Sequence, residues 1–107
     1  MPRFNDIQSI FSPDKIMSKD EILRAIKFGL SSEFESTQVY QQIMESTNNE
    51  QVKIVLTDII RDEMHHAGAL LQLLTLLSPA DAAEYGTGAR KALQELGYTG
   101  NENLLAW

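Results

Sequence analysis

The sequence has 107 residues, the length of one small domain with a modest core, and oligomerisation often adds stability at this size. Hydrophobic residues make up 43% of the chain and charged residues 22%, which is typical of a globular protein rather than a disordered or membrane protein. The formal net charge of −6 disfavours a nucleic acid as partner, because such binding depends largely on Lys and Arg, and it instead suits cations.

The chain contains no cysteine, which excludes disulfides, Cys-ligated zinc, iron–sulfur clusters and a rubredoxin-type iron site. Any metal must therefore be held by nitrogen and oxygen ligands. The longest apolar stretch, residues 67–77, is interrupted by Gln72 and Thr75, so no membrane-spanning segment is expected. The N-terminus lacks the continuous apolar segment of a signal peptide, and a cytoplasmic location is expected.

The chain is expected to begin with a loosely structured arm over residues 1–17, which contains two prolines that break regular structure. Ser18 then starts a helix, because Glu21 follows it by three residues and the two form a capping box. The apolar periodicity that follows predicts a long first helix over about 18–46.

A tight connection is predicted at residues 47–49, followed by a second long helix over about 50–77. Two long helices joined by so short a turn must run antiparallel. The predicted fold is therefore all-α, with an antiparallel two-helix hairpin as its main element.

The sequence after the hairpin carries weaker signals. The two glycines of 86–88 predict a loop, and residues 89–96 predict a short amphipathic C-terminal helix that Gly97 ends. The helical domain is thus expected to span 18–97, with a C-terminal tail over 98–107.

Both long helices place ionisable side chains in their apolar stripes. Continuing the steps of three and four residues leads to Glu33 in the first helix and to Glu63 and His66 in the second. An unpaired charge in an apolar seam is costly, so these side chains need a compensating partner. The stripe of the second helix otherwise consists of Val52, Leu56, Ile59, Leu70, Leu73 and Leu77.

Glu63 and His66 have the spacing Glu-x-x-His, so both project from one face of the helix and can bind one ion. Asp62 and His65 have the same spacing, but they fall on a neighbouring polar face and are interpreted as surface residues. The apolar stripe therefore selects Glu63 and His66 as candidate metal ligands.

Glu33 is the third candidate ligand. Glu33 and Glu63 are equally far from Asn48 at the turn, so antiparallel helices bring them level, and carboxylates with imidazole suit iron or manganese. In a diiron carboxylate bundle, two helices each supply a Glu and two others each supply a Glu-x-x-His. One chain supplies half of that set, so we expect a homodimer that forms a four-helix bundle around two metal ions.

Two further residues lie near the predicted ligands. Tyr40 belongs to the stripe of the first helix and is interpreted as a core residue, with a hydrogen bond to a ligand as the alternative. Glu35 is two residues from Glu33 and so lies on another face, where it is interpreted as a solvated charge.

Two segments carry a resemblance to a known family, the encapsulated ferritins of the ferritin-like superfamily. SSEFESTQVY at 31–40 contains an E-x-E motif, and IIRDEMHHAGALL at 59–71 contains a D/E-E-x-x-H-A motif thirty residues later. The resemblance extends over about residues 18–97. It implies a ferritin-like four-helix bundle that two chains build together.

The resemblance also implies a function. Glu33, Glu63 and His66 would be the iron ligands of a ferroxidase centre, with two Fe per dimer interface. Dimers would associate into a ring, commonly a decamer, that acts inside an encapsulin shell and leaves iron storage to that nanocompartment. Family members often carry an acidic residue before the ligand Glu, as part of an outer iron-attracting site. Ser32 stands there in this chain, which leaves Glu35 for that role.

The leading hypothesis is a dimeric ferroxidase in which Glu33 bridges two irons while Glu63 and His66 cap each one. A rubrerythrin-like peroxidase shares the ligand chemistry, but it usually needs Cys for an electron-transfer iron, and a single-chain bundle would need two Glu-x-x-His segments. A further alternative is a non-catalytic helical oligomerisation module whose Glu and His side chains form a buried hydrogen-bond network.

Overall fold

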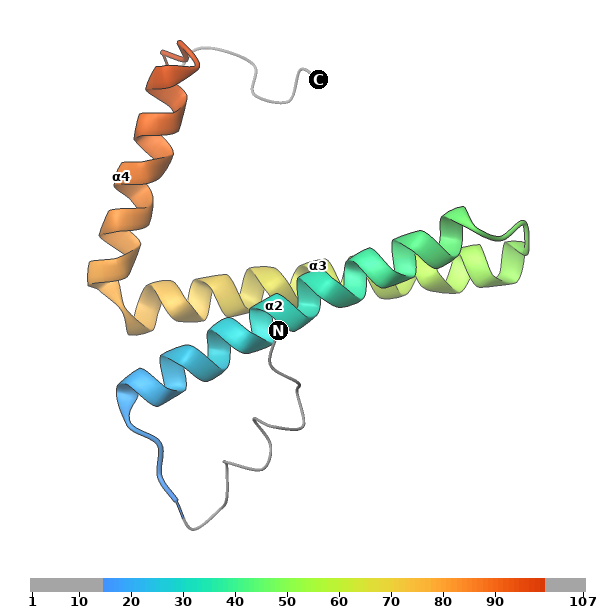
Figure 1. The fold of residues 1–107 in the computed structure, drawn as a ribbon, viewed down its shortest axis with the longest axis horizontal. Helices are drawn as coiled ribbons and strands as arrows, with labels where there is room; N and C mark the ends of the chain where they lie inside the picture. The colour runs from blue at the N-terminus through green and yellow to red at the C-terminus, as the bar shows by residue number, and fades with distance from the viewer. Residues whose placement is uncertain (1–14, 100–107) are drawn as a thin grey trace. The chain divides into compact units, whose positions relative to one another are not determined.

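The computed structural model describes residues 15–99, and within them all regular secondary structure is helical (Figure 1). The helices are α2 (Lys19–Glu45), α3 (Glu50–Leu77) and α4 (Pro79–Glu95). The all-α prediction is confirmed. None of these helices is long and apolar enough to cross a bilayer. Most of the predicted N-terminal arm and of the predicted tail lies outside the described residues.

The N-terminus of α2 is fixed by the predicted capping box. The Ser18 hydroxyl accepts a hydrogen bond from the Glu21 amide at 3.2 Å, and the Ser18 amide donates to Glu21 Oε1 at 3.1 Å. The hydrogen bonds from Ser18 lower the pKa of the Glu21 carboxyl below its ordinary value of 4.5. These reciprocal bonds satisfy two amides that a helix start would otherwise leave unpaired.

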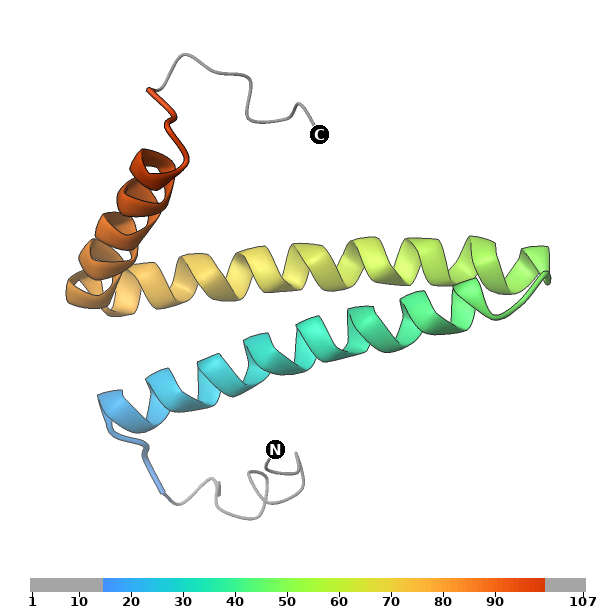
Figure 2. The ribbon, with the colours of Figure 1, turned by 45° about the horizontal axis from the view of Figure 1, so that its top comes forward.

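The turn between α2 and α3 is closed by side chains of the loop itself. The Thr47 hydroxyl accepts a hydrogen bond from the Asn49 amide, and the Asn49 side-chain oxygen accepts one from the Val52 amide at 3.1 Å. Asn49 is therefore the N-cap of α3. In both ribbon views the two helices then run side by side in opposite directions, as the short connection predicts (Figures 1 and 2).

The core of the hairpin departs from the predicted stripe of α3 at two positions, His66 and Leu73. Leu73, which was predicted to lie in the seam, is 40% exposed, whereas its neighbour Leu74 is only 7% exposed. Residues 73 and 74 are about 100° apart on a helix, and a broad apolar stripe fits either choice. The buried residues of the described chain are Leu23, Ala67 and Leu74.

One flank of the hairpin exposes apolar residues of α3. Val55 and Leu73 are exposed, and both lie on nearly the same side of α3 as His66, three turns before it and two turns after it. Exposed apolar side chains in register along one helix face are a candidate contact surface. We call this surface, formed by Val55, His66 and Leu73, the His66 flank.

Helix α4 belongs to a second compact unit that starts at Thr75. The predicted loop at 86–88 is wrong, because α4 runs unbroken through both glycines. A glycine costs a helix roughly 1 kcal/mol relative to alanine, but it keeps its amide hydrogen bond and so does not end the helix. Pro79 occupies the first turn, where its missing amide proton costs nothing.

The end of α4 is the one predicted for Gly97. This glycine has a φ of +80°, in the left-handed region, and its amide donates to the carbonyl of Gln94. The Tyr98 amide donates to the carbonyl of Leu93 at 2.9 Å. Together these two bonds form a Schellman motif, which pairs carbonyls that the helix end leaves open.

Candidate metal centre

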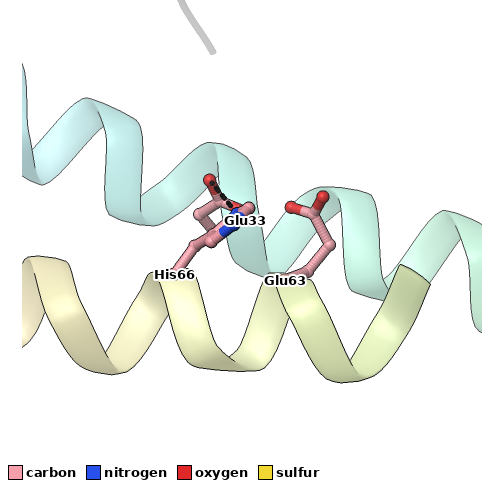
Figure 3. A group of neighbouring side chains, drawn as sticks. All are labelled: Glu33, Glu63 and His66. Carbon is pink, nitrogen blue, oxygen red and sulfur yellow. Dashed lines mark ion pairs between the residues drawn. The ribbon is translucent and has the colours of Figure 1, made fainter. Parts of the chain in front are cut away.

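The three predicted ligands meet midway along the hairpin. Glu33 projects from α2, and Glu63 and His66 project from α3 toward it (Figure 3). One potential ligand atom from each residue lies within 4.8 Å of the other two. The mirror spacing about the turn and the Glu-x-x-His spacing thus place three donor groups around one point, as expected from the sequence.

Glu33 and His66 interact directly across the helix pair. His66 Nδ1 lies 3.5 Å from Glu33 Oε1. The Glu33 side chain is 21% exposed, whereas the His66 side chain is 59% exposed and so lies at the edge of the hairpin rather than inside its seam. His66 was predicted to face inward, but in the single chain the neighbouring residue Ala67 is buried instead.

The other carboxylate oxygen of Glu33, Oε2, is buried and has no hydrogen-bond partner. Leaving such an oxygen unpaired costs about 1–3 kcal/mol, so native structures usually satisfy it. A cation would satisfy it, and the neighbouring carboxylate and imidazole are the donors that iron and manganese accept. The residues present therefore fit a metal ion.

Three donors do not complete an octahedral coordination shell, which takes about six ligands. His66 faces the uncovered flank, so further ligands have access from that side. The single chain therefore provides a partial site with an open edge.

The second acidic and histidine pair takes no part in this group. Asp62 and His65 are both exposed, and neither belongs to the cluster of potential ligands in the described residues. Helical phase had assigned this pair to the surface. Asp62 and His65 therefore provide matched control positions beside the candidate ligands.

Tyr40 and Glu35 lie beside the candidate centre rather than in it. Tyr40 is half-buried and Glu35 is exposed, and both line an open groove of about 510 Å³ on α2. The groove is also lined by Ser32, Ser36 and Val39.

One polar contact in the seam was not predicted from the sequence. The Thr37 hydroxyl donates a hydrogen bond to the Glu33 backbone carbonyl at 2.9 Å. A threonine four residues after a candidate ligand is a usable signal, because Ser and Thr in helices often bond to the carbonyl one turn earlier. The bond satisfies a hydroxyl that would otherwise lie unpaired beside Glu33.

Comparisons with known proteins agree with this architecture. The family described as Rubrerythrin matches residues 9–100. The crystal structure of the encapsulated ferritin domain from Pyrococcus furiosus superposes with a TM-score of 0.73 and 27% identity, covering 89% of this chain and 94% of that one. These findings confirm the predicted resemblance to encapsulated ferritins.

Two curated relatives are similar in sequence. A ferritin-like–encapsulin shell fusion protein of Pyrococcus furiosus is 24% identical over 89% of this chain, which spans only 28% of that protein. The encapsulin nanocompartment cargo protein EncC of Myxococcus xanthus is 30% identical over 78% of this chain, which spans 62% of that protein. With the family match covering residues 9–100, the chain belongs to the rubrerythrin family and has a ferritin-like helical fold.

Proposed function

We propose that the protein is a ferroxidase that oxidises Fe(II) to Fe(III) with dioxygen at a site formed by two copies of the chain. The observation that carries the proposal is the buried, unpartnered oxygen of Glu33 beside Glu63 and His66. Iron is the substrate, and it would give its electrons to dioxygen. The carboxylates favour the Fe(III) product because they are hard, charged oxygen donors.

Each candidate ligand has a distinct role in this proposal. Glu33 offers two carboxylate oxygens, one already near His66 and one without a partner, and so is suited to contact two ions. Glu63 and His66 each add a donor to the ion nearest their own chain. Iron binding would replace the Glu33–His66 contact, because both involve the same two side chains.

The second copy is supported by the open edge of the site. The His66 flank exposes Val55 and Leu73 on the same side as the half-open imidazole. A two-fold axis would bury this flank of both chains and bring two sets of Glu33, Glu63 and His66 together. The four helices of the two hairpins would then form the diiron carboxylate bundle.

We also propose an encapsulin shell as partner, because both curated relatives carry encapsulin in their names and one of them is a cargo protein. The protein would then lie inside a nanocompartment that stores the oxidised iron, with its dimers joined in a ring. In this setting Glu35 would attract Fe(II) at the groove on α2, and Tyr40 would hydrogen-bond to a ligand.

Steady oxidation of Fe(II) in air, followed by the absorbance of Fe(III), tests the ferroxidase proposal. Glu63→Ala or His66→Ala should reduce the initial rate to that of Fe(II) in buffer, because each removes a donor from the site. His65→Ala is the matched control, since it removes a neighbouring imidazole that lies outside the ligand cluster. Wild-type rates in His66→Ala would refute the assignment.

The same assay separates the two rival functions. A peroxidase would consume hydrogen peroxide faster than dioxygen when both are offered to the Fe(II)-loaded protein. A non-catalytic module would bind no iron, so its melting temperature and mass in solution would not change on adding Fe(II). The ferroxidase proposal requires binding of two iron ions per pair of chains and faster turnover with dioxygen.

A further inference from the structure

The side of the hairpin away from the His66 flank carries a second group of exposed apolar residues. Around the axis of α3, Met64 lies about 100° from Glu63. His66 lies about 60° from Glu63 in the opposite direction. Phe34 follows Glu33 in the same way on α2. In an antiparallel helix pair, the residues that directly follow two inward-facing residues, one on each helix, point to the same flank. Phe34 and Met64 therefore lie on one flank. Phe34, Met64 and Leu71 are exposed there, and we call them the Met64 patch.

Met64 is the most exposed methionine of the described chain. The protein has no cysteine, so methionine is its only sulfur-containing side chain. Of the methionines in residues 15–99, Met17 and Met44 are half-buried. Met44 Sδ also accepts a hydrogen bond from the Thr57 hydroxyl at 3.9 Å. Met64 is 61% exposed. Oxidation of methionine follows the access of the oxidant to sulfur, which favours Met64.

A source of oxidant follows from electron counting, and this step rests on the proposed function. Two Fe(II) ions supply two electrons, and two electrons with two protons reduce dioxygen to hydrogen peroxide. The balanced reaction is 2 Fe(II) + O₂ + 2 H⁺ → 2 Fe(III) + H₂O₂. Peroxide released from the site into solvent would reach the exposed side chains of the same protein, Met64 among them.

We propose that Met64 is a modification site, the first of the described methionines that hydrogen peroxide oxidises. The sulfur lone pair attacks one peroxide oxygen, the O–O bond breaks, methionine sulfoxide forms and the other oxygen leaves as water. The sulfoxide is polar, so the reaction places a hydrogen-bond acceptor in the apolar Met64 patch. The patch is thus sensitive to the product of the chemistry proposed for the adjacent site.

Peptide mass spectrometry of the intact, metal-free protein treated with hydrogen peroxide tests the proposal without any iron chemistry. Sulfoxide at Met64 should appear at least about threefold faster than at Met17 or Met44, because access to the oxidant governs the rate. Equal rates at the three sites, or faster oxidation of Met17 or Met44, would overturn it. Met64→Leu identifies the signal, since it removes the sulfur and keeps an apolar side chain.

A second experiment separates this proposal from the proposed function. Wild-type protein turning over Fe(II) in air should accumulate sulfoxide at Met64, and catalase or His66→Ala should suppress it. If added peroxide oxidises Met64 first but iron and dioxygen do not, the peroxide supply proposed for the site is wrong, while the modification site stands. If iron turnover oxidises Met17 or Met44 first, the assignment of Met64 fails.

Discussion

At the scale of single residues, the two carboxylate oxygens of Glu33 have different surroundings. It sits in an otherwise apolar stripe of α2, with one oxygen near His66 and the other buried without a partner. The nearby Thr37 hydroxyl donates its hydrogen bond to the Glu33 backbone carbonyl instead of to the carboxylate. These contacts support the proposal that Glu33 binds a metal ion.

The Glu33→Gln variant measures how the Glu33 charge affects the stability of the metal-free hairpin. The neutral amide removes a buried charge that has an unpaired oxygen. It also removes the contact with His66, which contributes only about 0–1 kcal/mol because the His66 side chain is exposed. The metal-free variant should therefore melt no lower than wild type by circular dichroism, while its affinity for Fe(II) falls. A markedly lower melting temperature would mean that the Glu33 charge stabilises the hairpin itself.

Glu21 and Ser18 make a residue-scale prediction about pH. The folded-state pKa of Glu21 lies below 4.5, so its stabilising contribution is present above that value and is lost as pH falls through the lowered folded pKa. Glu21→Gln should therefore differ most from wild type in melting temperature near pH 7 and approach it near pH 3. A difference that persists unchanged at low pH would contradict the assignment.

At the scale of the helices, a glycine of α2 lies beside α3 near the candidate site. Gly29 lies one turn before Glu33, and a Cβ built on it would lie 3.6 Å from Leu70 Cδ1, an ordinary contact distance. The hairpin alone thus has room for a methyl group at this position. Gly29 therefore lowers the stability of α2, although packing within the single chain does not require a glycine there.

The Gly29→Ala variant should therefore stabilise the metal-free hairpin, by about 0.5–1 kcal/mol, because alanine is the better helix former. Chemical denaturation measures the change in free energy of unfolding. Gly68→Ala is a suitable comparison, since a Cβ added to Gly68 would meet nothing within 4 Å in the described chain. Loss of stability at Gly29 alone would point to a tighter α2–α3 contact than the structure has.

The secondary structure and the site were predictable to different extents. Short-range signals predicted the start of α2, from Ser18 and Glu21, and the end of α4, from Gly97, but they missed the start of α4 at Pro79. The equal distance of Glu33 and Glu63 from the turn brought them together without any knowledge of side-chain contacts. The exposure of His66 was not predictable, because it depends on which of Leu73 and Leu74 faces α2, and the apolar pattern fits both.

At the scale of the whole molecule, the described hairpin has a small core, in which the buried side chains are Leu23, Ala67 and Leu74. Two helices expose both flanks of their contact, so the stability of such a hairpin depends on burying part of that surface. Under the proposed function a second chain covers the His66 flank. Stability, assembly and iron binding should then rise and fall together.

Leu73→Lys tests this coupling. A charge in the proposed interface should keep the chains apart, so light scattering should report a smaller mass, and Fe(II) should no longer raise the melting temperature. Ile54→Lys is the control, because Ile54 is exposed on the side of α3 that is turned away from α2. Unchanged assembly and iron binding in Leu73→Lys would place the interface elsewhere.

The open edge at His66 has a consequence for mixed populations of chains. In the proposed dimer every centre draws half of its ligands from each chain, so one defective copy disables the donors of its intact partner. With equal amounts of wild-type and His66→Ala chains pairing at random, roughly one quarter of dimers would keep both histidines. A defect in this short chain would therefore act as a dominant one in any cell that makes both forms.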